Sequence, residues 1–377
     1  MLIYKTYFYI CNETNNLIIL EKILEPYHLF HDPIRYYFSM LEDIRNAKKS
    51  IYIETYRIGN DSIGVKFKDL LTKKCKEGLD IKILIDSWGA GSVNHSFFSE
   101  LIKEGGKVRF FEKIKLNLDF FTRGHKRNHR KMIVVDNEIL YIGSSNITEY
   151  NMNWRELVLR MKGDIAFTLK KIINQDYRIY KKYVFDKRRY SRPIKYDNFK
   201  IIREVPSITI QRTKKEYEEL IKKAKKQVII ETPYFLPGFL LRKALMDAAK
   251  RGVDVKIIIP KHSDVNLVDV LRNKYLGIIH KSGIKILYYL PHNLHAKLLM
   301  IDEEIFSIGS LNFDYRSFRY MYEISLIGEE KEIIKQLKIH VAGTIKESKE
   351  FDYEHWKRRP MISRFFEWLL LPIRHLL

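Results

Sequence analysis

Cysteine is scarce in this chain, which has only Cys11 and Cys75. Two thiols cannot build a disulfide framework or a cysteine-based zinc site, and such low usage suits a reducing compartment. Long apolar runs are also lacking, since no stretch reaches the roughly 18 residues of a membrane span. The N-terminal "MLIYKTYFYIC" is apolar, but it is short and Lys5 interrupts it, so it has the layout of neither a span nor a signal peptide.

Acidic residues are outnumbered. The chain has 68 Lys and Arg against 46 Asp and Glu, for a formal net charge of +22. This surplus points to an anionic partner, either nucleic acid or an acidic membrane surface. With 377 residues and 46% hydrophobic content, the chain is long and apolar enough for one large packed domain or two ordinary ones.

One motif occurs twice. "HRKMIVVD" spans 129–136 and "HAKLLMID" spans 295–302, so His-x-Lys-x4-Asp is repeated. After six intervening residues, each Asp is followed by Gly-Ser-x-Asn, as "GSSN" from 143 and "GSLN" from 309. This many fixed positions do not recur by chance, and the repeat therefore needs a physical explanation.

The duplication extends beyond the motif. "SIYIETYRI" at 50–58 resembles "QVIIETPYF" at 227–235, and "GLDIKILID" at 78–86 resembles "GVDVKIIIP" at 252–260. These offsets of 177 and 174 exceed the offset of 166 between the two motif histidines. The first half therefore carries about eleven extra residues just before its motif, within 113–127.

Each half alternates short β-branched strands with amphipathic helical stretches, and the latter end in Gly78 and Gly252. Such alternation predicts an α/β fold of mixed sheets with helices on their faces. Polar, aperiodic residues 187–199 are the predicted linker. The predicted organisation is a first half at 1–190, a second half at 200–350 and a basic tail at 351–377.

The motif is predicted to be a strand that continues into a hairpin through the turn at 136–138. Because side chains alternate along a strand, His129 and Lys131 share one face, while Asp136 points elsewhere and fixes the surrounding structure. The second copy repeats this arrangement. Four further polar residues at the strand ends are predicted to hold phosphate oxygens: Ser144, Asn146, Ser310 and Asn312.

Displacing a phosphodiester needs one group that attacks phosphorus and another that protonates the departing oxygen. Two facing histidines supply both, which places the site between the halves. Each His would need an orienting partner, and Glu156 and Glu323 lie 27 and 28 residues after their own His. The competing interpretations are histidines that satisfy core hydrogen bonds and glutamates that lie exposed on strands. A lysine beside each His would repel a cation, so neither a metal nor a cofactor is expected.

These motifs resemble the phospholipase D superfamily, over about residues 34–345. "ETYRI", "WRELVLRMKG", "ETPYFLPG", "GVDVKIIIPKHSD" and "NFDYRSF" are similar to stretches of bacterial cardiolipin synthases. The resemblance implies two pseudo-symmetric α/β/α halves around one shared active site and a covalent phosphohistidine intermediate. It implies His129 as the nucleophile, although the pseudo-symmetry leaves the roles exchangeable. The catalytic set that it implies is His129, Lys131, Asp136, His295, Lys297 and Asp302.

The chain departs from that family in two ways. Met321 stands where cardiolipin synthases often have Asn, and Val158 stands where they often have His. These departures concern recognition of the acceptor. The usual pair of N-terminal membrane spans is not seen, which resembles a shorter, peripheral form.

The resemblance implies transfer of a phosphatidyl group from phosphatidylglycerol to an alcohol, ideally a second phosphatidylglycerol. The expected partner is an anionic phospholipid membrane at the cytoplasmic face, without nucleic acid; the oligomeric state is open. A hydrolytic phospholipase D, a nuclease of the same superfamily and an inactive membrane-binding scaffold are the alternatives. The intact motifs in both halves argue against the scaffold.

The tail "MISRFFEWLLLPIRHLL" at 361–377 has apolar residues at helical spacing and is too short to span a bilayer. It is predicted to be an interfacial helix, with Trp368 at the lipid boundary; a helix docked on the protein core is the alternative. "KIKLNLDFF" at 113–121 is either a second lipid-facing loop or loop core. The cations expected to anchor the tail are Lys357, Arg358, Arg359, Arg364 and Arg374.

Overall fold

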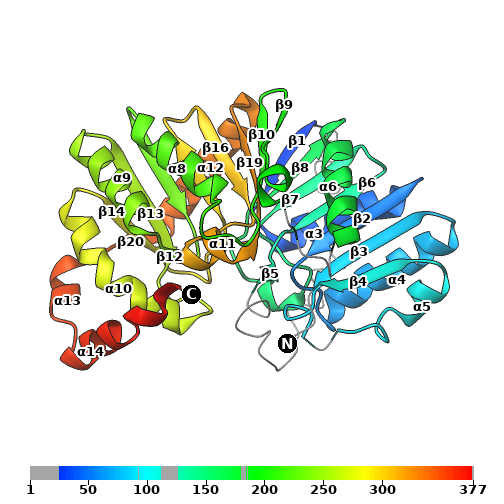
Figure 1. Cartoon of the computed structure of the whole chain (residues 1–377), viewed down its shortest axis with the longest axis horizontal. Helices are drawn as coiled ribbons and strands as arrows, with labels where there is room; N and C mark the ends of the chain where they lie inside the picture. The colour runs from blue at the N-terminus through cyan, green and yellow to red at the C-terminus, as the bar shows by residue number, and fades with distance from the viewer. Residues whose placement is uncertain (1–24, 92, 112–125, 180–183, 185, 376–377) are drawn as a thin grey trace.

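The computed structural model describes residues 25–375, apart from positions 92, 112–125, 180–183 and 185. Two halves lie side by side, and each is built on one large sheet (Figure 1). Both the N-terminal "MLIYKTYFYIC" and the inserted "KIKLNLDFF" lie outside the described residues.

The first half contains a seven-stranded mixed sheet with the order β1-β8-β7-β6-β2-β3-β4. β2 pairs with β3 in parallel and with β6 in antiparallel orientation. The strands are β1 (Tyr27–Phe30), β2 (Ser50–Thr55), β3 (Asp80–Asp86), β4 (Lys107–Phe111), β6 (Met132–Val135), β7 (Ile139–Gly143) and β8 (Val158–Lys162).

The second half contains a nine-stranded sheet with the order β20-β14-β13-β11-β15-β16-β19-β10-β9. Its run from β19 to β14 repeats the run from β8 to β4, which confirms the predicted duplication. The strands are β9 (Ile194–Tyr196), β10 (Phe199–Arg203), β11 (Gln227–Glu231), β13 (Asp254–Pro260), β14 (Lys285–Tyr289), β15 (Leu298–Ile301), β16 (Ile305–Gly309), β19 (Ile324–Gly328) and β20 (Ser348–Glu350).

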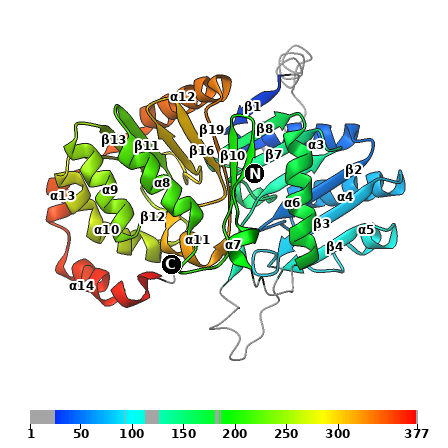
Figure 2. The same cartoon turned by 45° about the horizontal axis from the view of Figure 1, so that its top comes forward.

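The helices form layers around the two sheets (Figures 1 and 2). α3 (Pro33–Asn46), α4 (Ser62–Lys76) and α5 (Ser99–Lys103) pack on the outer face of the first sheet. α8 (Arg212–Lys223), α9 (Phe239–Lys250) and α10 (Asn266–Lys281) pack on the outer face of the second. The inner faces of both sheets share one apolar core with α6 (Ile165–Ile179) and α12 (Lys331–Lys346).

Strand alternation explains how one sheet serves two cores. In β6, Met132 and Val134 point into the shared core, while Ile133 and Val135 point into the outer core of the first half. The shared core joins the halves into one body, as expected for two α/β/α units around a common seam. The predicted glycine caps are also confirmed, since Gly78 and Gly252 follow α4 and α9 with φ of +91° and +89°.

The predicted linker at 187–199 contains regular structure. Its residues form α7 (Lys187–Tyr190) and β9, and β9 pairs with β10 at the edge of the second sheet. An edge strand does not have to bury a full face, and β9 has no buried residue. Its sequence therefore lacks the apolar alternation that identifies the inner strands.

The motif aspartates hold a turn and its neighbouring chain. Asp136 begins the turn between β6 and β7 with φ of +54°, and its carboxylate accepts from the backbone N–H groups of Lys48, Lys49 and Ser50 at 2.6, 2.7 and 2.9 Å. Asp302 does the same in the second half, accepting from residues 225–227 at 2.7–2.9 Å. Both lie at the far end of their strand from the motif His, which agrees with the expected structural role.

The turn provides a stability prediction. Asp136→Asn keeps a residue that tolerates positive φ but replaces one acceptor oxygen and removes the charge. We expect the free energy of unfolding to fall by about 1.5–3 kcal/mol, because hydrogen bonds to a charged group are lost. Urea denaturation measures this. The control Asp69→Asn removes an exposed carboxylate beside Lys68 and should change stability by less than about 0.5 kcal/mol. Equal effects in the two variants would contradict the assignment.

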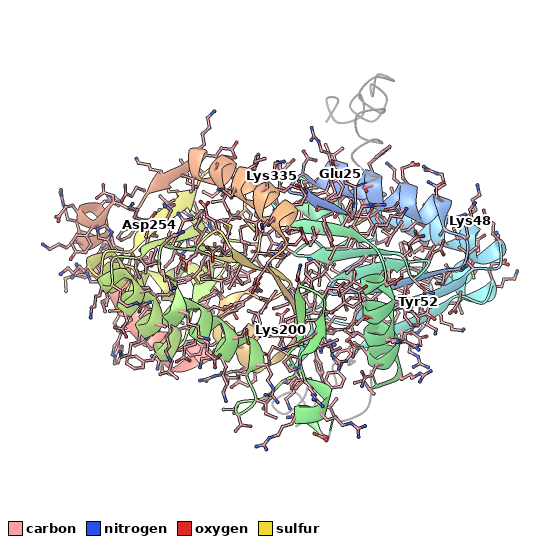
Figure 3. The ribbon with its side chains drawn as sticks, turned by 90° about the horizontal axis from the view of Figure 1, so that it is seen from above. Glu25, Lys48, Tyr52, Lys200, Asp254 and Lys335 are labelled. Atoms are coloured by element: carbon pink, nitrogen blue, oxygen red, sulfur yellow. The ribbon has the colours of Figure 1, made fainter. Side chains whose placement is uncertain are left out.

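A surface charge pair is also repeated between the halves. Asp80 lies 3.2 Å from Lys107, and Asp254 lies 3.2 Å from Lys285 at the equivalent place in the second sheet. Figure 3 shows the two halves from above: the labelled Asp254 lies in the second half, and the labelled Lys48 lies in the first half, on the opposite side of the seam. Exposed pairs of this kind contribute little to stability. Their repetition is therefore evidence of the duplication and does not explain why the fold is stable.

Candidate active site

The two motifs meet where the halves touch. β5 (Arg127–Asn128) pairs in parallel with β18 (Met321–Tyr322) of the other half, and the backbone N–H of His129 donates to the carbonyl of Tyr322 at 2.9 Å. On the other side a parallel bridge joins Arg155 to Leu294, and the N–H of His295 donates to the Arg155 carbonyl at 2.8 Å. Only the second part of the predicted motif strand is therefore in the main sheet, because its first residues pair across the seam.

This pairing exchanges the glutamates between the halves. His129 Nδ1 lies 3.0 Å from Glu323 Oε1, and His295 Nδ1 lies 2.9 and 3.0 Å from the two carboxylate oxygens of Glu156. Each motif His is thus paired with the carboxylate of the opposite half. Both glutamates are fully buried. With Nδ1 engaged by a carboxylate, Nε2 is the ring nitrogen that remains for chemistry.

The motif serines bind these glutamates. Ser144 Oγ donates to Glu156 Oε2, and Ser310 Oγ donates to Glu323 Oε2 at 2.5 Å. Each hydroxyl has one proton to donate. Because that proton is already in the hydrogen bond to the carboxylate, the same hydroxyl does not donate to a phosphate. We therefore correct the predicted phosphate-binding role of the serines: in this structure they hold the carboxylates that orient the histidines.

The glycine before each serine allows this contact. A Cβ on Gly143 would lie 2.2 Å from the Leu157 carbonyl oxygen, and one on Gly309 would lie 2.1 Å from that of Ile324. No side chain fits at such distances, so the two strands approach closely only at glycine. The Gly-Ser pair of the motif thus has a physical cause: glycine admits the neighbouring strand, and serine reaches the glutamate near its start.

The motif lysines are buried beside the histidines. Lys131 Nζ donates to the His129 carbonyl at 2.7 Å, and Lys297 Nζ donates to the His295 carbonyl at the same distance. Burial, which disfavours the charged form, lowers the pKa of Lys131 to about 7 and that of Lys297 to about 8. A bound phosphodiester would bring the negative charge that keeps both ammonium groups protonated.

Burial also lowers the pKa of His129 to about 4, with the charges of Lys131 and Lys297 acting in the same direction and Glu323 opposing them. Lys297 belongs to the second half, so the two motifs lie close enough for their charges to interact. Burial alone would raise the pKa of Glu156, but His295, Lys297 and Ser144 outweigh it and bring it to about 2. Glu156 therefore stays ionised at neutral pH.

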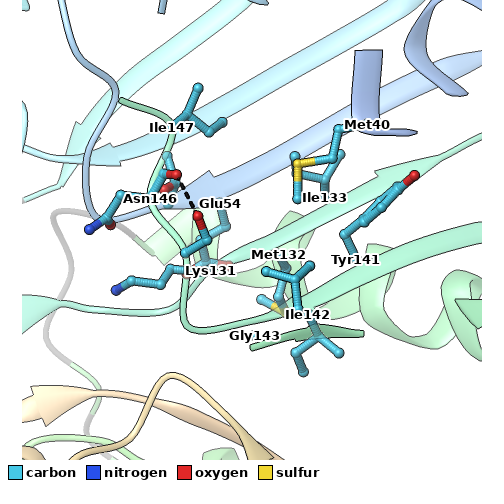
Figure 4. A pocket seen from close by; sticks show the side chains of 13 residues that line it. Met40, Glu54, Lys131, Met132, Ile133, Tyr141, Ile142, Gly143, Asn146 and Ile147 are labelled. Atoms are coloured by element: carbon cyan, nitrogen blue, oxygen red, sulfur yellow. Dashed lines mark hydrogen bonds between the residues drawn. The ribbon is translucent and has the colours of Figure 1, made fainter. Parts of the chain in front are cut away.

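The two motif asparagines occupy equivalent positions. Among the described residues, Asn146 Oδ1 and Asn312 Oδ1 are buried without a hydrogen-bond partner. In the close view of the pocket behind Lys131, the Lys131 and Asn146 side chains extend toward the same side, away from Met40 and Tyr141 (Figure 4). Turning the amide would present an NH₂ donor there, so both asparagines stay candidates for holding a phosphate oxygen.

Comparisons with known proteins agree with this geometry. A family described as "Cardiolipin synthase, PLD-like domain" matches residues 40–177 and 217–343. Cardiolipin synthase 1 of Staphylococcus aureus (strain COL) is 32% identical over 343 residues, covering 88% of this chain and 69% of that protein. The chain belongs to this family.

Two further relatives extend the comparison. A cardiolipin synthase of Listeria monocytogenes serotype 4a (strain HCC23) is 32% identical over 351 residues, covering 90% of this chain and 73% of that protein. The crystal structure of phosphatidylserine synthase from Haemophilus influenzae Rd KW20 superposes with a TM-score of 0.73 at 16% identity, covering 93% of this chain and 95% of that one. That likeness supports the expected fold of the cardiolipin synthase, PLD-like family.

One residue that the motif leaves unspecified also supports the site. The guanidinium of Arg130, between His129 and Lys131, donates to the Glu323 carbonyl at 3.1 Å and to the Glu204 carbonyl at 2.9 Å. Asp176 pairs with it, and all its contacts are buried. The second motif has Ala296 at this position. Only a comparison of the two halves could have drawn attention to this arginine.

Aromatic rings flank both histidines. The Tyr56 ring lies edge-on to His129 with centroids 5.2 Å apart, and the Trp154 ring lies 5.1 Å from His295. These rings limit the orientations that each imidazole can adopt. Of the two departures from other cardiolipin synthases, Val158 is buried in the outer core of the first half, whereas Met321 lies on β18 beside the seam. Val158 also lines the pocket behind Lys131, so both departures lie near motif residues.

Proposed function

We propose that this protein is a cardiolipin synthase that moves a phosphatidyl group from one phosphatidylglycerol to another, with release of glycerol. The observation that carries the proposal is the pair of crossed His–Glu contacts, which places two oriented imidazoles in one buried site. The family assignment supplies the reaction class, a phosphatidyl transfer of the phospholipase D type.

In the proposed first step, Nε2 of His129 attacks the phosphorus of the donor. A nitrogen–phosphorus bond forms, and the bond from phosphorus to the oxygen of the headgroup glycerol breaks. Protonated His295 gives its proton to that oxygen, so the headgroup leaves as glycerol. In the second step, neutral His295 takes the proton of the acceptor hydroxyl. The acceptor oxygen attacks phosphorus, the nitrogen–phosphorus bond breaks, and both histidines return to their starting states.

The assignment of roles has support from the two contacts. Glu156 meets His295 through both oxygens, at 2.9 and 3.0 Å, whereas Glu323 meets His129 through one oxygen at 3.0 Å. Burial lowers the pKa of His295 as well, and Glu156 opposes this effect through its two close oxygens, which favours the imidazolium form that the general acid needs. His129, whose pKa burial lowers to about 4, is neutral at physiological pH, as a nucleophile must be.

The lysines are proposed to stabilise the charge that develops on the phosphoryl oxygens. Lys131 and Lys297 approach the site from opposite halves and bring two positive charges without a metal. Because its substrates are lipids, we propose that the enzyme acts peripherally at the cytoplasmic face of the membrane. Within the described part of the chain, no helix is both long and apolar enough to cross a bilayer.

The acceptor distinguishes this function from its alternatives. Purified protein incubated with phosphatidylglycerol vesicles should produce cardiolipin and glycerol in equal amounts, measured by lipid chromatography and a glycerol assay. Phosphatidic acid with glycerol but without cardiolipin would identify a hydrolase. Cleavage of DNA without turnover of lipid would identify a nuclease, the alternative that the net charge of +22 keeps open.

We expect metal chelators to leave the reaction intact. The positive charge at phosphorus is assigned to two lysines, so kcat with EDTA should stay within about twofold of its value without EDTA. The measurement uses a short-chain, monomeric phosphatidylglycerol, which removes effects of divalent ions on lipid packing. Activity lost in EDTA and restored by one particular divalent ion would contradict the assignment.

A further inference from the structure

The C-terminal helix α14 (Met361–Leu369) exposes its apolar side chains and buries its acidic one, the opposite of a helix that docks on a core. Its carboxylate, Glu367, is only 3% exposed, whereas Met361, Ile362 and Trp368 are 84%, 60% and 63% exposed. Phe365, Phe366 and Leu369 are about half exposed. Six large apolar side chains of one short helix thus face outward, while its acid faces the protein.

The inward side of the helix is firmly attached. Glu367 accepts from Arg359 at 2.7 and 2.8 Å, and Trp356 of α13 (Tyr353–Lys357) donates its Nε1–H to the Asn273 carbonyl of α10 at 2.9 Å. Leu370, directly after the helix, packs into a small apolar cluster with Tyr315. The helix therefore needs no burial of its outer face to stay in place. α14 contacts α10, but its apolar side faces away from the protein.

Exposed cations lie on α14 and in the segment directly before it. Of the five predicted anchors, Arg359 pairs with Glu367, and Arg374 donates to the Tyr275 hydroxyl at 3.3 Å. The other three, Lys357, Arg358 and Arg364, are exposed. An apolar face bordered by exposed cations matches a surface that combines hydrocarbon with negative charge.

The same face suits a second copy of the chain less well. Two copies meeting through α14 would bring the three exposed cations of each against those of the other, on molecules that each carry +22. The only acid within the helix is buried and already paired. Charge complementarity therefore selects an anionic lipid surface.

The chain after α14 runs toward an element next to the motif residues. After α14 the chain forms η3 (Leu371–His375), which contacts α11 (Tyr315–Arg319). α11 directly follows β17 (Phe313–Asp314), and thus Asn312. Figures 1 and 2 show α14 and the C-terminus running along the lower side of the second half toward α11. A membrane that receives α14 would thus lie on the side of the molecule where α11 follows Asn312.

We propose that α14 inserts its outer face into the interfacial region of an anionic bilayer and holds the site against the lipid from which it draws its substrate. The effect on turnover rests on the proposed function, but the binding does not. We define the face variant as Ile362→Ser, Phe365→Ser and Trp368→Ser combined. The matched control is Phe167→Ser, Ile208→Ser and Ile339→Ser, three exposed apolar residues elsewhere in the described part of the chain.

Binding is measured by co-sedimentation with vesicles of equimolar phosphatidylglycerol and phosphatidylcholine, and with phosphatidylcholine alone. We expect the face variant to bind the anionic vesicles at least about tenfold more weakly, while the control binds like the unchanged protein. Neutral vesicles should bind the unchanged protein more weakly than anionic ones. Thermal denaturation of both variants verifies that they are folded.

Two results would overturn the proposal. One is a folded face variant that binds anionic vesicles as well as the control does. The other is a dimer of the unchanged protein in analytical ultracentrifugation that the face variant abolishes, which would assign the face to a second copy. Turnover of short-chain phosphatidylglycerol is measured in parallel. Loss of vesicle binding without any turnover in the unchanged protein would refute the proposed function and leave this inference standing.

Discussion

His129→Ala and His295→Ala are each expected to lower kcat by at least about four orders of magnitude, because a nucleophile and its acid partner act as a unit. Removing His129 removes the atom that would bond to phosphorus. Removing His295 leaves the departing alkoxide without a proton and the acceptor hydroxyl without a base. The measurement is turnover of a short-chain phosphatidylglycerol, which does not depend on binding to vesicles.

A trapping experiment separates the two roles. Acid-labile phosphate should be found on the His295→Ala protein when it is denatured during turnover, because the intermediate on His129 breaks down slowly without a base. It should be missing from the His129→Ala protein. The opposite pattern would reverse the roles, and substantial turnover by either folded variant would contradict the mechanism. His292→Ala, outside the motif, is a control for loss of a histidine from the same loop.

The duplication could be predicted because it depends on local rules. Short strands with alternating apolar residues, helices that end at Gly78 and Gly252, and tight turns at Asp136 and Asp302 each depend on a few neighbouring residues. Their recurrence in order was sufficient to predict two similar halves. The structure confirms this down to the order of the central strands.

The exchange of glutamates could not be predicted in the same way. It depends on how the halves dock, through the pairing of β5 with β18 and the bridge between Arg155 and Leu294. No local pattern encodes such a contact between distant residues. The role of the serines was missed for the same reason, since Ser144 reaches a glutamate whose function lies with His295.

The tail presents a different limit of sequence reasoning. Helical spacing correctly indicated an apolar face, but spacing does not tell whether that face meets the protein or the solvent. Glu367 decides the orientation, because its pairing with Arg359 turns the helix so that its acid is buried. The ion pair joins residues eight positions apart, across the break between α13 and α14. Periodicity within one helix cannot reveal it.

The crossed pairing leads to a second prediction. Glu323→Gln and Glu156→Gln are each expected to lower kcat by roughly 10²–10⁴-fold, because an amide no longer stabilises the imidazolium or fixes the ring in one tautomer. The two losses should fall on different steps. Glu323→Gln acts on the proposed nucleophile and should slow formation of the phosphohistidine, whereas Glu156→Gln acts on its acid and base and should also slow breakdown.

Titration of the two imidazoles tests the crossing itself, without relying on activity. The charge of Glu323 raises the pKa of His129 against the effect of burial, so Glu323→Gln should lower the pKa of His129 and shift its ring resonances. Glu156→Gln should do the same to His295, whose pKa is lowered by burial and raised in opposition by the charge of Glu156. Nuclear magnetic resonance of protein labelled only at histidine measures both, with each histidine assigned by substitution. If each glutamate instead perturbs the histidine of its own half, the halves do not dock through β5 and β18. If Glu323→Gln moves neither resonance, the carboxylate does not orient His129, and the loss of kcat must come from the fold.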